Sequence, residues 1–169
     1  MRRLALVAVF ALFLSGAAAS SAMAGVRGSD RPFSGSVVGM AIFVPANPLG
    51  CPPPYSITTT AEAVGTMSHL GLVTMTSSHC PLADSTVADA TMTLVAANGD
   101  KLFGTYTGGS GPPGADGYFF GHYTVTFAGG TGRFQHASGT AAITAKVLFL
   151  GFDVLDWPAT WSFEGTLSY

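Results

Sequence analysis

Short segments in which apolar and polar residues alternate follow one another along most of this 169-residue chain. In the last segment Trp161, Phe163 and Leu167 share one face, and threonine, serine and glutamate occupy the positions between them. This period of two residues is typical of a half-buried antiparallel strand. After residue 32, no segment longer than a turn shows a convincing helical repeat. The pattern predicts strands at residues 33–44, 57–68, 71–78, 87–96, 101–108, 118–127, 140–150 and 159–168.

Turn residues separate these segments, as in the Asn98-Gly99 pair, which is a strong hairpin signal. Strands that each have one apolar face can form either a sandwich or a closed barrel. Small residues on the apolar faces favour closure, because they let a strongly coiled sheet approach itself. These residues are Gly39, Ala41, Gly104, Gly121 and Gly165. We therefore predict an all-β fold, an eight-stranded antiparallel closed β-barrel, with a β-sandwich as the alternative.

The first 24 residues have the features of a secretory signal peptide. Two arginines precede an apolar run over residues 4–14, and Ala22-Met23-Ala24 fits the small-residue rule of signal peptidase. Eleven apolar residues rise only about 16 Å as a helix, roughly half the hydrocarbon thickness, which disfavours a membrane anchor. We predict cleavage after Ala24 and a secreted or periplasmic location. A short leader at 25–32 would then precede one barrel domain at 33–169.

The two cysteines, Cys51 and Cys80, both lie in the exported part of the chain. An even pair in an oxidising compartment predicts a disulfide. The alternative is a redox or metal pair together with the neighbouring His79, which would supply too few ligands for a typical site. The other histidines are scattered over separate segments, so we predict no metal site and no cofactor.

Charge is sparse in this chain: 9% of residues are charged, and the formal net charge is −2. Cleavage after Ala24 leaves five basic and nine acidic residues, a charge of −4. This balance excludes nucleic-acid binding by a basic surface. The export signal, the strand count and the terminal Tyr169 also fit an outer-membrane barrel. That alternative would push threonines and charges into a narrow lumen, so we predict no stable membrane insertion.

No nucleophile motif or phosphate loop stands out, and the catalytic candidates are weak ones, His69 and Glu62. His69 lies at the junction of two predicted strands, where it acts either as a rim acid or base, or as a hydrogen-bonding group that fixes the bend. Glu62 alternates with threonines, which predicts a solvated side chain. A lumenal Glu62 would instead be a perturbed acid.

Aromatic residues on the apolar faces are the ligand-binding candidates: Tyr106, Phe119, Tyr123 and Trp161. They would line a pocket with rings and hydroxyls. The alternative is that they fill the lumen, because an eight-stranded barrel is barely wide enough for its own side chains.

The segment from Gly129 to Gly139 reads GGTGRFQHASG. Its pattern of Gly129, Gly130, Gly132, Phe134 and Gly139 resembles the motif shared by allene oxide cyclases and dirigent proteins. Residues 32–36, 68–71, 96–104 and 163–166 are similar to small secreted bacterial proteins of the same barrel type. On the residues alone, the glycines permit a sharp reversal, Phe134 closes a barrel end and Gly139 releases the chain into the next strand.

The resemblance implies an eight-stranded barrel with an apolar lumen, often assembled as a homo-oligomer. For the plant relatives it implies enclosing a reactive apolar molecule and steering its ring closure or coupling, and it carries over no catalytic residue. We predict a secreted barrel that binds a small apolar molecule in or at the mouth of the barrel. The alternatives are an isomerase or cyclase acting by lumenal confinement, and a structural or surface-interaction protein with a solid lumen.

Overall fold

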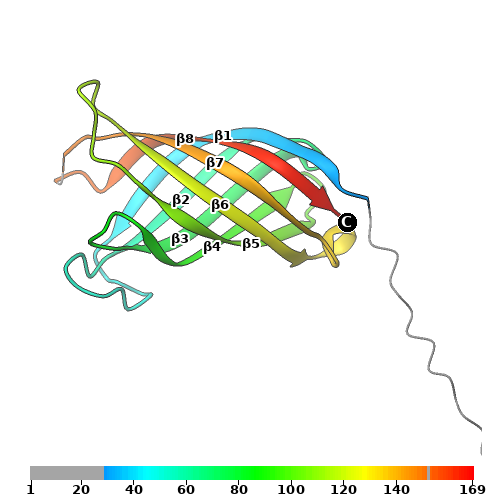
Figure 1. Ribbon diagram of the computed structural model, residues 1–169, viewed down its shortest axis with the longest axis horizontal. Helices are drawn as coiled ribbons and strands as arrows, with labels where there is room; N and C mark the ends of the chain where they lie inside the picture. The colour runs from blue at the N-terminus through cyan, green and yellow to red at the C-terminus, as the bar shows by residue number, and fades with distance from the viewer. Residues whose placement is uncertain (1–28, 152) are drawn as a thin grey trace, which may run out of the picture.

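The computed structural model describes residues 29–151 and 153–169. Eight antiparallel strands form one closed barrel, in which each strand pairs with the next and the last pairs with the first (Figure 1). This confirms the predicted closed barrel and excludes the sandwich. The strands are β1 (Arg31–Val44), β2 (Thr58–Met67), β3 (Gly71–Pro81), β4 (Val87–Ala96), β5 (Lys101–Ser110), β6 (Tyr118–Gly130), β7 (Ser138–Leu148) and β8 (Asp156–Ser168).

The predicted signal peptide at 1–24 and its cleavage site after Ala24 lie outside the described residues, as do leader residues 25–28. In the part of the chain that the structure describes, no helix has the length and apolar character needed to cross a membrane.

Alternation along the strands sends bulky side chains into the lumen, as the sequence predicts. Trp161, Leu94 and Val125 are buried in one continuous core, and Tyr123 packs against it. Threonines at the alternate positions of β5 and β6 are exposed. The barrel therefore has an apolar interior and a hydroxyl-rich outer surface.

The seam between β1 and β8 is longer than the sequence predicts. Strand β1 starts at Arg31, which pairs with Leu167, and β8 starts at Asp156, which pairs with Ile42. The Asp156-Trp157-Pro158 segment has the local composition of a turn. It is extended because the partner strand supplies a full ladder beside it, a tertiary effect that local composition does not encode.

Glycines allow the neighbouring strands to approach closely. A Cβ atom on Gly39 would lie 1.9 Å from the carbonyl oxygen of Glu62, and one on Gly165 would lie 2.0 Å from that of Thr140. These contacts are far shorter than any van der Waals separation. The small residues on the apolar faces therefore permit the tight coiling of the barrel wall.

One end of the barrel is closed by the glycine-rich segment and the 3₁₀ turn η1 (Gly132–Phe134). The Phe134 side chain is fully buried, and Ala137 is buried beside it. Behind this plug, Phe33 and Phe127 pack edge to face with ring centroids 5.1 Å apart. This half of the lumen is filled with side chains, as predicted for an eight-stranded barrel.

The glycines of the segment have two distinct roles. Gly129 and Gly132 have left-handed φ values of 76° and 55°, as predicted for a sharp reversal. Gly130, which the structure describes, does not have a positive φ. The expectation that it supplies a left-handed residue to the reversal is therefore wrong. Its role is close approach, because a Cβ there would lie 2.0 Å from the Lys101 carbonyl oxygen. Gly139 likewise approaches the Thr166 carbonyl oxygen too closely for a side chain.

The other end carries the long connections, which extend beyond the strands on the left of Figure 1. They are residues 45–57, 82–86, 111–117 and 149–155. We call the half of the barrel next to these loops the open half, and the half plugged by Phe134 the closed half.

Candidate functional site

The open half of the barrel contains a cavity of about 800 Å³. Its wall combines lumenal side chains of the strands with residues of all four long loops. Because several of those loop residues, such as Tyr55 and Leu155, are exposed, the cavity reaches the surface between the loops. Ligand sites for drug-sized molecules span roughly 300–1,000 Å³, so the cavity has room for a small organic molecule.

Small side chains create this space. In the open half, inward positions carry Ala41, Ala61, Gly121 and Ala145, all of which line the cavity. The expectation that aromatic side chains fill the lumen therefore holds only for the closed half. Phe33, Phe127 and Phe134 fill the closed half, whereas these small residues leave space between the side chains of the open half.

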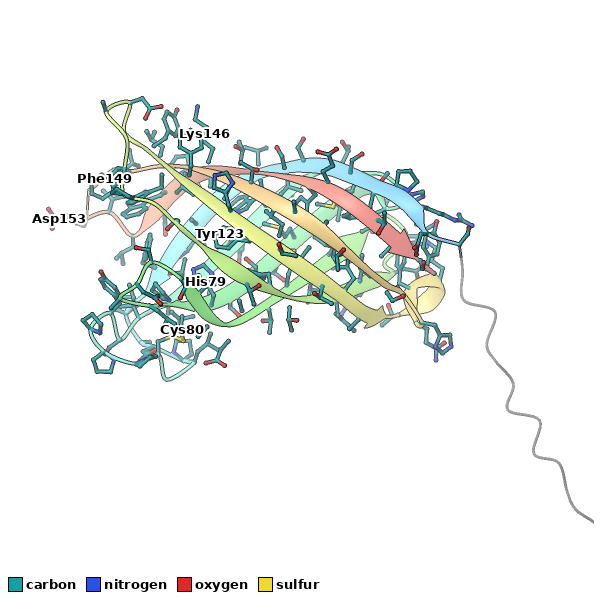
Figure 2. The ribbon with its side chains drawn as sticks, in the orientation of Figure 1. His79, Cys80, Tyr123, Lys146, Phe149 and Asp153 are labelled. Atoms are coloured by element: carbon teal, nitrogen blue, oxygen red, sulfur yellow. A yellow bond between two sulfur atoms is a disulfide. The ribbon has the colours of Figure 1, made fainter. Side chains whose placement is uncertain are left out.

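All four predicted ligand-binding residues, Tyr106, Phe119, Tyr123 and Trp161, line the cavity. The rings of Tyr106 and Tyr123 meet edge to face with centroids 5.6 Å apart. Figure 2 shows Tyr123 and His79 in the open half of the barrel. The structure thus brings together residues of β5, β6 and β8 around one space.

An aromatic cluster lies nearer the mouth. Phe119 stacks on Trp157 with ring centroids 5.5 Å apart, and Phe149 meets both rings edge to face. The indole nitrogen of Trp157 donates a hydrogen bond of 2.8 Å to the Val154 carbonyl oxygen. This bond ties Val154 to β8, and Val154 and Leu155 both line the cavity.

In the sequence, His79 stood out only as the neighbour of the cysteine pair, and nothing identified it as a lumenal residue. Its Nδ1 atom lies 2.7 Å from the Tyr106 hydroxyl oxygen, within hydrogen-bond distance. The register of β3 shifts between Ser78 and Cys80, so His79 lies at a bulge in the pairing with β4. The available signal was its position two residues after Ser77 and four after Met75, on the inward face of β3.

Burial keeps the side chains of His79, Tyr106 and Tyr123 uncharged. It lowers the pKa of His79 to about 4. Burial also raises the pKa of the Tyr106 phenol, which a hydrogen bond with Ser77 opposes only in part. The pKa of Tyr123 is raised by burial in the same way. Among the described residues that line the cavity, none is Asp, Glu, Lys or Arg.

A second polar residue that sequence reasoning missed is Thr59. Its Oγ1 atom is buried and has no hydrogen-bond partner within residues 29–151 and 153–169. Thr59 lines the cavity and pairs directly with His79 across β2 and β3. Alternation with Ala61 and Ala63 would place Thr59 on the inward face, but the sequence does not show that its hydroxyl lacks a partner.

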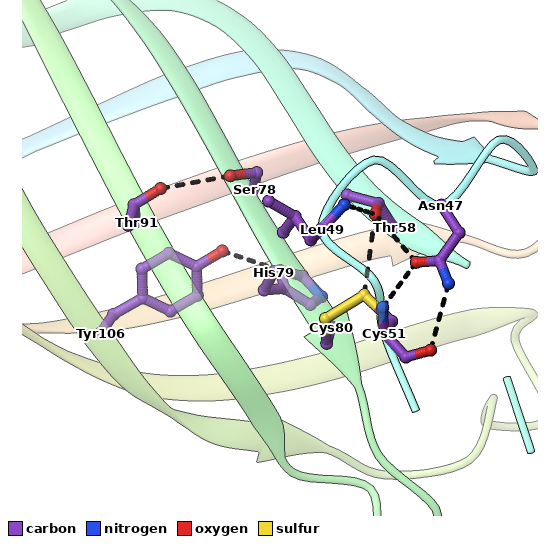
Figure 3. Close-up of a disulfide and its surroundings, with 9 residues drawn as sticks. All are labelled: Asn47, Leu49, Cys51, Thr58, Ser78, His79, Cys80, Thr91 and Tyr106. Carbon is purple, nitrogen blue, oxygen red and sulfur yellow. Dashed lines mark hydrogen bonds between the residues drawn. A yellow bond between two sulfur atoms is a disulfide. The ribbon is translucent and has the colours of Figure 1, made fainter. Parts of the chain in front are cut away.

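The predicted disulfide between Cys51 and Cys80 is present and ties the 45–57 loop to the end of β3, next to His79 (Figure 3). Asn47 supports the loop, because its Oδ1 accepts a 2.7 Å hydrogen bond from the Cys51 backbone N–H. Since Tyr55 and Ile57 line the cavity, the disulfide holds one side of its mouth.

The weak catalytic candidates lie elsewhere. Glu62 is exposed on the outer face of β2, where it borders a shallow groove with threonines of β3 and β4. His69 lies in the turn at the closed end with a left-handed φ of 69°, and its Nε2 lies 2.8 Å from the Pro32 carbonyl oxygen. Neither residue lines the cavity.

No group of three or more His, Cys, Asp or Glu side chains suited to a metal ion occurs among the described residues. The site is instead an uncharged, mostly apolar chamber with a few hydrogen-bonding groups. Comparisons of the chain with protein-family models, curated proteins and solved structures found no match.

Proposed function

We propose that this small β-barrel domain binds a small, predominantly apolar molecule in its open half. The observation that carries the proposal is the cavity of about 800 Å³, walled mostly by aliphatic and aromatic side chains. Burying apolar ligand surface against such a wall contributes roughly 25 cal/mol per Å². The few hydroxyl and imidazole groups then orient the molecule.

The contrast between the two halves of the lumen supports this proposal. The closed half is filled by side chains such as Phe33, Phe127 and Phe134. An unfilled apolar space forgoes dispersion contacts that larger side chains would supply. Keeping Ala61 and Ala145 at inward positions therefore reduces packing and makes room for an occupant.

We further propose that binding takes place outside the cytoplasm, after cleavage near Ala24. The disulfide between Cys51 and Cys80 supports this location, because disulfides persist mainly in oxidising compartments.

The test is uptake of N-phenyl-1-naphthylamine, an uncharged dye that fluoresces in apolar surroundings. The purified protein should bind it saturably. Ala145→Phe, which fills the cavity, should weaken binding by more than about tenfold. Ala142→Phe is the matched control, because Ala142 is exposed on the outer face of the same strand. No uptake by the wild type, or equal uptake by the Ala145→Phe and Ala142→Phe proteins, would contradict the proposal.

A second candidate is catalysis by confinement, as the resemblance to allene oxide cyclases and dirigent proteins implies. The bonded His79 and Tyr106 side chains favour it, since they place a proton donor and an acceptor beside the enclosed space. Incubation with an apolar extract, followed by mass spectrometry, separates the two functions. A compound that the wild type consumes and the Tyr106→Phe variant does not would indicate catalysis. A compound retained unchanged would indicate binding alone.

A further inference from the structure

Among the described residues, the buried Thr59 hydroxyl has no hydrogen-bond partner, whereas the adjacent Thr58 hydroxyl has one. Thr59 is 7% exposed, and its Oγ1 has no hydrogen bond within the described residues. The Thr58 Oγ1 accepts a hydrogen bond from the Leu49 backbone N–H. Burial of an unsatisfied hydroxyl destabilises a fold, and valine would fill the same volume without that cost. A bound molecule that forms a hydrogen bond with the Thr59 hydroxyl would remove this cost.

The cross-strand neighbour of Thr59 on β3 supplies a second hydrogen-bond donor. Thr59 and His79 are directly paired, so their Cβ atoms lie roughly 4.5–5.5 Å apart. One hydrogen bond of 2.7 Å joins Nδ1 of His79 and the hydroxyl of Tyr106. When the Tyr106 hydroxyl donates to Nδ1 of His79, the hydrogen on Nε2 is left for another acceptor. When Nδ1 donates to Tyr106 instead, the hydrogen of the phenol is left for another acceptor. In either tautomer the pair keeps one hydrogen outside the bond that joins it.

The chamber offers nothing to balance a charge. The described residues of its wall include no acidic or basic side chain, and burial holds His79 in the neutral form near pH 7. Lys146, on β7, is exposed and lies over the Tyr118 ring at 3.9 Å, on the outer side of the barrel wall. A carboxylate or an ammonium group would therefore lose its hydration without gaining a counter-charge.

From these three observations we infer that the bound molecule is uncharged and largely apolar, and that it carries a hydroxyl or carbonyl oxygen that Thr59 and the His79–Tyr106 pair bind. This inference rests on the proposed function and adds the chemical class of the ligand. Two donors on neighbouring residues match the two lone pairs of such an oxygen. The aromatic and aliphatic wall accommodates the rest of the molecule.

The experiment is displacement of bound N-phenyl-1-naphthylamine at pH 7.5 by three naphthalenes of similar shape. These are 2-acetylnaphthalene, which has a carbonyl oxygen, 2-ethylnaphthalene, which has none, and 2-naphthoate, which is ionised. For the wild type, the concentration of 2-naphthoate that displaces half of the dye should be more than about tenfold higher than that of 2-acetylnaphthalene. Thr59→Val should raise the concentration of 2-acetylnaphthalene needed for half displacement by about 3- to 10-fold. For 2-ethylnaphthalene the change should stay within about twofold.

Thr59→Ser is the control, because it retains the hydroxyl and should retain the wild-type response to 2-acetylnaphthalene. A thermal melt of each variant checks that it is folded. The inference is overturned if Thr59→Val affects the carbonyl and ethyl compounds equally, or if 2-naphthoate displaces the dye as well as its neutral analogue. These results leave the proposed function standing. Absence of dye uptake by the wild type would overturn both.

Discussion

The hydroxyl oxygen of Tyr106 and Nδ1 of His79 lie 2.7 Å apart inside the barrel, although β5 and β3 do not pair with each other. Strand β4 separates the two, and the residues are 27 positions apart in the chain. Closure of the sheet directs both side chains into one narrow lumen, which is how they meet. Tyr123, from β6, meets Tyr106 edge to face and extends the same polar cluster.

Stability should depend on pH through His79. Its pKa is about 4 in the folded protein, against 6.5 for an unperturbed histidine. Between these values the unfolded chain binds a proton that the folded chain excludes, so this residue lowers stability as pH falls from 6.5 to 4. Urea unfolding at pH 7.5 and pH 4 should show that the wild type loses about 2–3 kcal/mol more than His79→Gln.

The control for this experiment is His122→Gln, since His122 is exposed on the outer face of β6. Its loss of stability between the two pH values should match that of the wild type. Equal losses for the wild type and His79→Gln would show that His79 titrates normally.

Replacing either of two adjacent threonines by valine should change the free energy of unfolding of the ligand-free protein, in opposite directions for the two positions. Thr59→Val should raise the free energy of unfolding by about 1 kcal/mol, because it removes a buried hydroxyl that has no partner in the described part of the chain. Thr58→Val should lower it by about 1–3 kcal/mol, because the Leu49 N–H then loses its acceptor. Urea denaturation of both variants measures the difference, and effects of the same sign would contradict the assignment.

Removal of the disulfide should weaken both the fold and the mouth of the cavity. The cysteines are 29 positions apart, and a bridge of that span stabilises by about 3–4 kcal/mol in the chain-entropy treatment. The double variant Cys51→Ser/Cys80→Ser should lose that stability in urea. It should also bind the dye more weakly, since the freed loop carries Tyr55 and Ile57.

Alkylation of the unreduced wild type, followed by mass spectrometry, provides the control for the disulfide prediction. It should label neither cysteine. Two labelled thiols in the wild type, or a loss below about 1 kcal/mol in the double variant, would count against the prediction.

Close strand approach should make Gly39 intolerant of even a methyl group. Gly39→Ala would place Cβ 1.9 Å from the Glu62 carbonyl oxygen, so backbone must move. We expect a loss of about 3 kcal/mol or more. Gly111→Ala is the matched control, because nothing lies within 4 Å of a Cβ there, and it should stay within about 1 kcal/mol of the wild type. Thermal unfolding of the two variants compares them, and similar melting temperatures would refute the packing argument.

Strand positions and inward faces could be predicted from the sequence where alternation is unambiguous. Trp161 and Phe163 alternate with serine and glutamate, so their burial follows from local backbone geometry. The same reasoning found the lumenal aromatic residues. Alternation with Ala61 and Ala63 would also place Thr59 on the inward face. That its hydroxyl has no hydrogen-bond partner among the described residues could not be predicted, because this depends on the packing of neighbouring strands.

The amino-acid sequence alone determined the short β-strands, their apolar faces and the single cysteine pair, because each depends on neighbouring residues or on composition. Tertiary structure decided what those faces enclose. Whether Ala61, Gly121 and Ala145 face one another across a space depends on the register of every strand and on the β1–β8 seam. Those pairings join residues far apart in the chain, and the volume left inside the barrel is a sum over all of them.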